Sequence, residues 1–101
     1  MHSLSERELK KQMLCICNQL NYYARKIIFD GRNGAPDWLI IKPSGEMLWI
    51  ELKASGKTPE AHQLREHRRL RSYGQQVVVV DSIELLTSVL GNPHETSNQG
   101  C

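Results

Sequence analysis

The sequence has no long apolar run. None of its stretches approaches the roughly 18 consecutive apolar residues that a membrane-spanning helix needs. The first residues also lack the apolar core of a secretory signal peptide. We therefore expect a protein that works in the cytoplasm and does not enter a membrane.

Two further absences exclude classes of enzyme. The glycine-rich phosphate motif of P-loop enzymes is missing. Cys15 and Cys17 are spaced C-x-C, which cannot chelate zinc in the C-x-x-C manner without further ligands nearby. They also lie far in sequence from His62 and His67, so a hydrolase built on a cysteine and a histidine has no support.

The composition indicates one globular domain. A chain of 101 residues is long enough for one compact domain and too short for two. We predict a single domain over residues 1–91. Residues 92–101 are polar and lack any apolar period, so we expect a disordered tail there.

The stretch from Gly34 to Lys53 has the pattern of a β-hairpin. Apolar, β-branched and aromatic residues fill Trp38 to Ile41 and again Met47 to Leu52, and Pro, Gly or Ser bounds each run. Pro43 and Ser44 suit the centre of a type I turn, with Gly45 in the left-handed position that follows.

This turn fixes which side chains face one another. Counting outward from it, Asp37 falls opposite Glu51, and Lys53 lies one step further on the same side. The other face is wholly apolar and should pack beneath helices; its side chains are Trp38, Ile40, Leu48, Ile50 and Leu52.

Two acids at the rim of a buried sheet call for a cation, because burying an unpaired carboxylate costs several kcal/mol. Ligation by oxygen alone suits Mg²⁺ or Mn²⁺. The alternative is a surface ion pair of Glu51 with Lys53 while Asp37 only caps a loop. The agreement of turn type, register and spacing favours the metal site.

The remaining segments predict an α/β fold in the order αβββαβα, with a mixed sheet flanked by helices. A right-handed crossover would place the valine-rich strand parallel to the second hairpin strand. The predicted elements are a helix from Ser3 or Ser5 to about Asn21, a strand from Tyr22 to Phe29, the hairpin, a helix capped by Thr58 and running to about Tyr73, a strand from Gln75 to Val80, and a helix opened by Asp81 to Glu84 and ending at Leu90.

Helical periodicity identifies two more polar residues as candidates for the site. Glu6 projects at the edge of the buried stripe of the first helix; helical geometry alone leaves open a role as a mere helix-start residue. Gln63 falls in an inner arc centred on Leu64, His67 and Leu70, where a buried amide needs a partner, and a structural role is the alternative. We expect His67 to be a hydrogen-bonded core histidine and His62 to be exposed.

These motifs resemble a known family. Gly34-Ala35-Pro36-Asp37, followed after a short hairpin by Glu51-Leu52-Lys53, resembles the PD-(D/E)XK nucleases with the restriction-endonuclease-like fold. Within that superfamily the chain resembles a stand-alone VRR-NUC domain from about Ser5 to Leu86. The flanking features are the helix with Glu6, the Gly56 to Pro59 link followed by Gln63, and the strand from Gly74 to Asp81.

The resemblance implies metal-dependent hydrolysis of phosphodiester bonds in DNA, with Mg²⁺ as cofactor and Mn²⁺ as a substitute. It implies a metal site built from Asp37, Glu51, the carbonyl of Leu52 and Glu6. Lys53 would orient the attacking water or stabilise the developing anion, and Gln63 would position that water or Lys53. On this basis Glu6 and Gln63 are expected in the catalytic site.

Basic residues suggest where nucleic acid would bind. The net charge of +2 is too small to indicate this by itself. The segment that holds Lys57, Arg65, Arg68, Arg69 and Arg71 is nevertheless strongly basic, and we expect it to contact phosphates in a salt-sensitive, sequence-independent way. Arg32 and Asn33 could touch a phosphate from their glycine-rich loop. For the loop and the helix alike, a merely solvated surface is the alternative.

Cutting both strands of a duplex needs two active sites about a two-fold axis, and one domain of this size offers one. Small stand-alone relatives resemble junction-resolving enzymes. We therefore expect a homodimer acting on branched, Holliday-junction-like DNA in replication, repair or recombination, encoded by a phage or bacterium. The alternatives are a non-catalytic DNA-binding module with the nuclease fold and an RNA-directed nuclease.

Overall fold

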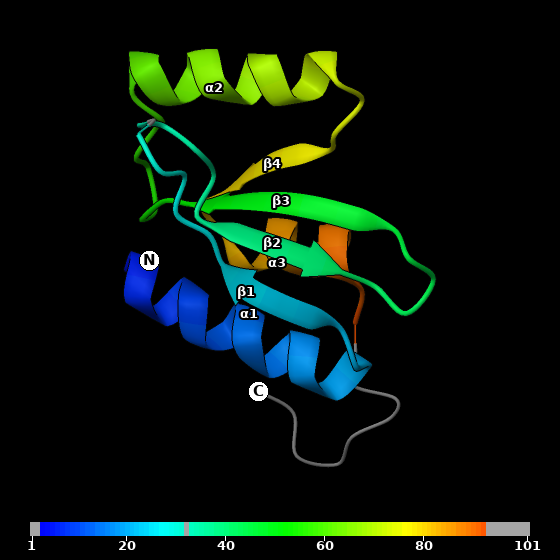
Figure 1. The fold of residues 1–101 in the computed structure, drawn as a ribbon. Helices are drawn as coiled ribbons and strands as arrows, with labels where there is room; N and C mark the ends of the chain where they lie inside the picture. Colours follow the sequence, from blue (N-terminus) through cyan, green and yellow to red (C-terminus); the bar gives the residue numbers. More distant parts are fainter. Residues whose placement is uncertain (1–2, 32, 93–101) are drawn as a thin grey trace.

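The computed structural model describes residues 3–31 and 33–92. Its elements follow the predicted order αβββαβα, which confirms the α/β fold (Figure 1). Arg32 and almost all of the predicted tail lie outside the described residues. The elements are α1 (Glu6–Leu20), β1 (Tyr23–Lys26), β2 (Trp38–Ile41), β3 (Met47–Leu52), α2 (Ala61–Ser72), β4 (Val77–Val80) and α3 (Ile83–Leu90).

One mixed sheet forms the centre of the domain. Its strand order is β1-β2-β3-β4. The first three strands are antiparallel, and β4 runs parallel to β3. The parallel placement agrees with the crossover predicted through α2.

The β2–β3 hairpin has the predicted register. Leu39 pairs with Trp49, and Ile41 pairs with Met47. At the turn the Lys42 N–H donates to the Glu46 carbonyl at 2.9 Å, and Gly45 has φ 94°. The positive φ is the left-handed conformation that this turn requires and that glycine adopts without strain.

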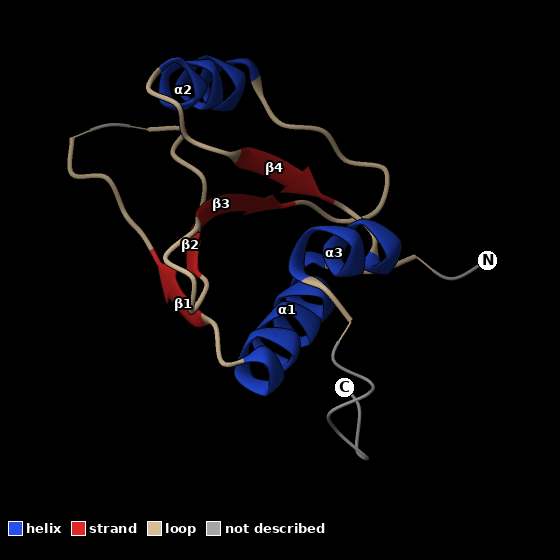
Figure 2. Cartoon of the chain, turned by 90° about the vertical axis from the view of Figure 1, so that its right-hand side faces the viewer, coloured by secondary structure: helices blue, strands red, loops and turns tan. Residues whose placement is uncertain are grey.

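Helices cover the two faces of the sheet unequally. Figure 2 shows α1 and α3 together on one side and α2 on the other, next to β4. The apolar face of the hairpin is buried beneath α1 and α3, as predicted. The core includes Leu9, Met13, Ile16, Trp38, Ile40, Leu48, Ile50, Leu52, Val80, Leu86 and Leu90.

The first helix begins where its capping residues place it. The Ser5 hydroxyl accepts from the Glu8 N–H, and the Glu8 carboxylate accepts from the Ser5 N–H, which is a complete capping box. Asn21 ends the helix in a left-handed conformation. The Tyr22 hydroxyl then donates to the Leu90 carbonyl at 2.9 Å, which ties the end of α1 to the end of α3.

Three predicted boundaries are wrong. The first strand stops at Lys26, well before Phe29, because its partner β2 only begins at Trp38. Helix α2 begins at Ala61 after Glu60, and not after Thr58. The last strand begins at Val77, two residues after the predicted start.

The inner face of α2 also differs from the prediction. Leu64 is 41% exposed, whereas Glu66 and His67 are buried. The helix is therefore turned so that polar residues face the sheet. Among the described residues, none of the helices is long and apolar enough to cross a membrane.

Candidate active site

The candidate site lies at one end of the sheet. Figure 1 shows the start of α1, the loop between β1 and β2 and the start of α2 all at the same side of the molecule. These segments carry Glu6, Asp37 and Gln63, and the end of β3 supplies Glu51 and Lys53. Residues that are distant in sequence thus meet beyond the ends of the strands.

Asp37 and Glu51 lie on the same face of the hairpin. Trp38 and Ile50 are the last paired residues of β2 and β3, so continuing the register by one places Asp37 opposite Glu51. The bonded pair of Lys42 and Glu46 makes this a non-hydrogen-bonded pair, in which opposed side chains approach closest. The predicted register is therefore confirmed as far as the pair of Trp38 and Ile50. It supports a position of Asp37 opposite Glu51.

The Glu51 carboxylate is buried, with only 2% of the residue exposed. Its Oε2 accepts a hydrogen bond from Gln63 Nε2 at 3.0 Å and lies 3.8 Å from Lys53 Nζ. Its Oε1 has no hydrogen-bond partner among the described residues. Burial, together with the nearby charges of Asp37 and Glu6, raises the pKa of Glu51 to about 7 against the opposing effects of Lys53 and the Gln63 hydrogen bond.

Gln63 connects the start of α2 to the end of β3. Its Oε1 accepts from the Glu60 N–H at 2.9 Å while its amide nitrogen donates to Glu51. Both ends of the amide are thus fixed, one by the helix cap and one by the carboxylate. The partner of the half-buried Gln63 amide is Glu51 itself.

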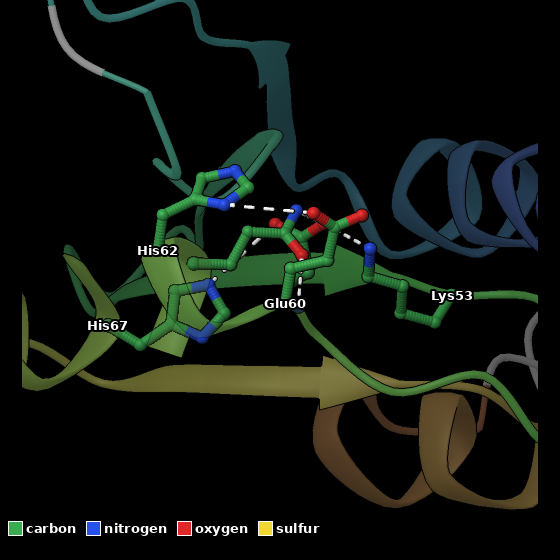
Figure 3. A network of polar contacts seen from close by, with 6 residues as sticks. Lys53, Glu60, His62 and His67 are labelled. Atoms are coloured by element: carbon green, nitrogen blue, oxygen red, sulfur yellow. Dashed lines mark hydrogen bonds and ion pairs between the residues drawn. The ribbon is translucent and has the colours of Figure 1, made fainter. Parts of the chain in front are cut away.

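His67 lies on the other side of the same carboxylate. The residue is fully buried, and its Nε2 is 3.7 Å from Glu51 Oε1. Figure 3 shows the side chains of Lys53 and His67 directed from opposite sides toward one network of polar contacts. Burial lowers the pKa of His67, and the charges of Arg71 and Lys53 lower it further, so the ring is neutral near pH 7.

The prediction that His67 lies in the core is confirmed, but the prediction that its ring is hydrogen-bonded is wrong. Neither ring nitrogen of His67 has a hydrogen-bond partner in the described part of the chain. Sequence reasoning did place His67 on the same helix face as Gln63, four residues earlier. That spacing was the available signal that the ring faces the site.

The carbonyl of Leu52 is directed away from β4. The Lys53 N–H donates to the Val80 carbonyl of β4, so the main-chain groups of the preceding residue point toward the β2 side. Continuing the hairpin register by two residues puts Pro36 there, and proline has no N–H to donate. The Leu52 carbonyl therefore lacks the ladder partner that another residue type at position 36 would offer.

A cleft of about 220 Å³ opens beside these groups. It brings Glu6 to the same space as Asp37 and Leu52. The other residues that line the cleft are basic or aromatic: Arg7, Lys10, Lys26 and Trp38. The sequence alone places none of them in the site. Lys10 lies four residues after Glu6 on the helix, and this spacing could have indicated a shared face.

The donor set fits a hard divalent cation. Glu51 Oε1, which has no hydrogen-bond partner among the described residues, the Asp37 carboxylate opposite it and the Leu52 carbonyl beside the cleft are all oxygen ligands. In the part of the chain that the structure describes, no three His, Cys, Asp or Glu residues are grouped so that they could hold a metal ion. A metal ion would therefore depend on Asp37 and Glu51 together with the Leu52 carbonyl, with Glu6 at the rim.

Those predicted nucleic-acid-binding residues that the structure describes lie on the surface. Asn33 is exposed and lines a second hollow, of about 200 Å³, that also reaches Asp37. The basic residues Lys57, Arg65, Arg68 and Arg69 are all exposed. Because Gln63 and His67 face the sheet, helical geometry directs Arg65 and Arg68 to the opposite side of α2. Arg69 pairs with Glu66 at 3.7 Å.

Comparisons with known proteins agree with this fold. No protein-family model matches the chain. The chain is 38% identical over 85 residues to "Putative nuclease p44" of Acyrthosiphon pisum secondary endosymbiont phage 1, covering 84% of this chain and 91% of the relative. A solved structure described as "VRR_NUC domain" superposes with a TM-score of 0.79 at 34% identity, covering 85% of this chain and 95% of the other.

Proposed function

The chain belongs to the VRR-NUC family of nucleases, and on that premise we propose that it hydrolyses phosphodiester bonds of DNA with a divalent metal ion. Mg²⁺ would be the natural ion and Mn²⁺ a substitute. The observation that carries the proposal is the buried Glu51 carboxylate, which has one oxygen without a hydrogen-bond partner among the described residues and lies opposite Asp37 at the open end of the hairpin. Burying an ionised carboxylate costs several kcal/mol of free energy unless a cation lies beside it.

Asp37, Glu51 and the carbonyl of Leu52 would hold the ion, and Glu6 would complete its surroundings or contribute to a second ion. When bound, the ion supplies Lewis-acid chemistry that activates water and offsets charge on the phosphate. Gln63 holds Glu51 in one orientation through its hydrogen bond to Oε2. The burial of Glu51 keeps bulk water away from that carboxylate.

Lys53 would act on the reacting groups themselves. Its ammonium lies 3.8 Å from Glu51 Oε2 and is largely buried, so its charge is only weakly screened. A cation in this position orients the attacking water and stabilises the developing anion. Exchanging Lys53 for Ala should leave metal binding largely intact and remove most activity, whereas Asp37→Ala should remove both.

Basic and polar residues would contact the DNA backbone away from the reacting bond. These are Lys57, Arg65, Arg68 and Arg69 on and before α2, with Arg32 and Asn33 in the loop before Asp37. Because one domain carries one site, we propose a homodimer that cuts branched DNA at two strands. The phage origin of the relative favours a phage or prophage protein that acts in the cytoplasm of its host, in replication, repair or recombination.

The test is a cleavage panel. A labelled four-way junction, a flap, a linear duplex and a matched RNA are incubated with Mg²⁺, Mn²⁺ or EDTA, beside the Glu51→Ala protein. We expect metal-dependent cutting of the branched DNA that the substitution abolishes. Cutting of RNA alone would correct the substrate to RNA, and tight DNA binding without any cutting would identify a non-catalytic binding module.

A further inference from the structure

The cleft beside Asp37 has two chemically different walls. One wall is acidic and carries Glu6 and Asp37, next to Leu52. The other is basic: Arg7 and Lys10 come from the first turns of α1, and Lys26 comes from the end of β1. Helix α1 packs against β1, so the three cations belong to one contiguous surface.

The three cations are available to a ligand. Arg7, Lys10 and Lys26 are exposed, and none of them takes part in an ion pair with another described residue. They outnumber the two carboxylates that line the same cleft. A divalent ion held by the acids would neutralise the acidic wall and leave the basic wall with an excess of positive charge, which favours an anion.

The size of the cleft limits what that anion can be. At about 220 Å³ it is smaller than the pockets of roughly 300–1,000 Å³ that enclose drug-sized molecules. It suits a single backbone unit better than a whole nucleotide. Phosphate oxygens are the groups that arginine and lysine side chains bind most readily.

The basic side chains of α2 are placed differently. Helix α2 lies on the other side of the sheet from α1, as Figure 2 shows. Arg65 and Arg68 are on the surface of α2 that faces away from the sheet. A short strand that lies in the cleft would meet Arg7 and Lys10 first, and only a longer substrate would also reach α2.

We infer that Arg7, Lys10 and Lys26 form a phosphate-binding subsite that holds the nucleic-acid strand directly beside the metal-binding acids. This inference rests on the proposed nuclease function, since it assigns a second phosphate contact next to the reacting one. It also separates two binding surfaces: the cleft cations hold the strand at the site, and the α2 arginines hold more distant phosphates.

The test compares three variants by binding, which does not depend on cleavage. The Arg7→Ala/Lys10→Ala protein is compared with Arg65→Ala/Arg68→Ala, which loses the same charge, and with Lys11→Ala. Lys11 lies on the same helix and lines a different hollow, with Leu4 and Ile83. Fluorescence anisotropy in EDTA measures the affinity for a six-nucleotide single strand and for a long duplex at several salt concentrations.

We expect only the Arg7/Lys10 variant to lose affinity for the short strand, by about tenfold or more, because two charge-assisted contacts disappear. Its slope of log affinity against log salt should fall by about 1.4, at about 0.7 for each lost single-strand phosphate contact. Both double variants should bind the long duplex more weakly. With Mg²⁺, the Arg7/Lys10 variant should show a raised KM and a kcat changed by less than about threefold.

If the Arg7→Ala/Lys10→Ala protein has the same short-strand affinity and salt slope as the Lys11→Ala protein, the subsite is overturned. A parent protein that binds no strand at all would overturn it too. A parent that binds the short strand through Arg7 and Lys10 yet cuts nothing with any metal would overturn the nuclease proposal and leave the subsite standing. Circular dichroism of each variant confirms that α1 is folded.

Discussion

Glu51 occupies a place in which its charge is unfavourable. Burial and the neighbouring acids raise its pKa to about 7, and neither the Lys53 ammonium nor the Gln63 hydrogen bond fully offsets this. A cation next to the unpartnered Oε1 would remove the penalty. Protonation and metal binding are thus two ways in which the unfavourable charge of Glu51 can be neutralised.

Metal affinity should therefore depend on pH. A metal ion binds the ionised carboxylate, so protons compete with it below the pKa of about 7. We expect the affinity for Mn²⁺ to rise about tenfold between pH 6 and pH 8, with release of one proton in the lower part of that range. Isothermal titration calorimetry in two buffers of different ionisation enthalpy measures both, and an affinity independent of pH would contradict the assignment.

The stability of the metal-free protein should change in the opposite direction. The folded-state pKa of Glu51 lies above the unfolded value, so its protonation stabilises the fold at low pH, and this contribution is lost as the pH rises through about 7. The Glu51→Gln protein, measured in EDTA, serves as the control. The free energy of unfolding of the Glu51→Gln protein, taken relative to that of the parent, should be higher at pH 8 than at pH 5.

The buried ring of His67 makes no hydrogen bond to the described residues, so the free-energy cost of burying its nitrogens is not offset. Exchanging an unsatisfied buried polar group for an apolar one of similar size is neutral or stabilising. The ring also lies beside Glu51. If it positions that carboxylate, replacing the ring should lower activity on the order of 10-fold or more. We expect His67→Leu to melt no lower than the parent and to lose that activity.

Thermal melting and cleavage rates measured on the same preparations decide this point. A large loss of melting temperature together with activity would mean that His67 has only a structural role. Leu64→Ala is the matched control on the same helix, because that side chain is 41% exposed and away from the carboxylate. It should change neither quantity by much.

The sequence predicted the register of the hairpin that carries the acids better than the surroundings of His67. Asp37, Glu51 and Lys53 follow from turn chemistry and a period of two, both local properties. The inner face of α2 was mispredicted because the pattern favoured burial of Leu64 over Glu66. Gln63 and His67 instead face Glu51 on the sheet, and these contacts override the apolar pattern.

At the scale of elements, the loop before β2 packs tightly against the start of α2. Gly34 has φ 93°, and a Cβ at this position would lie 2.5 Å from the carbonyl oxygen of His62. Only glycine permits both the left-handed backbone and this close approach. The contact fixes the first turn of α2, which carries Gln63, against the loop that carries Asp37.

The Gly34→Ala substitution should therefore destabilise the protein by roughly 3 kcal/mol or more, through backbone strain and collision with the helix backbone. Gly56→Ala is the control, because Gly56 has φ 79° and a methyl group there would meet nothing within 4 Å. Strain alone should cost that variant about 1 kcal/mol. Equal losses in urea denaturation would show that the contact with α2 contributes nothing.

Pro36 tests the role of the Leu52 carbonyl. Pro36→Ala restores an N–H opposite that carbonyl and would extend the β2–β3 ladder by one bond. We expect a stable fold and a weaker metal site, seen as a raised Mg²⁺ concentration for half-maximal activity. Pro43→Ala, in the hairpin turn, is the control, and the same half-maximal concentration in both variants would rule out the carbonyl as a ligand.

The element boundaries that the sequence missed depend on contacts between elements. Thr58 and Pro59 are a good local start for a helix, yet α2 begins later because Gln63 accepts the Glu60 N–H while bonded to Glu51 on β3. Likewise, the length of β1 is set by where β2 begins. Local propensity has no access to either contact.

At the scale of the whole molecule, the site is assembled from both sides of one sheet. Helix α1 brings Glu6, Arg7 and Lys10 to the cleft from one side, and α2 brings Gln63 and His67 to Glu51 from the other. The hairpin between them supplies the acids. The order of elements was predictable from turns and caps, whereas the joining of the basic wall to the acids became visible only in three dimensions.

Mn²⁺ binding by the parent, Asp37→Asn and Lys53→Met proteins at pH 8, measured by calorimetry, tests the proposed metal site most directly. We expect the parent and the Lys53 variant to bind the ion with similar affinity and the Asp37 variant to lose at least about tenfold, since one of its carboxylate ligands is gone. Unchanged binding by the Asp37→Asn protein would contradict a metal site formed by Asp37 and Glu51.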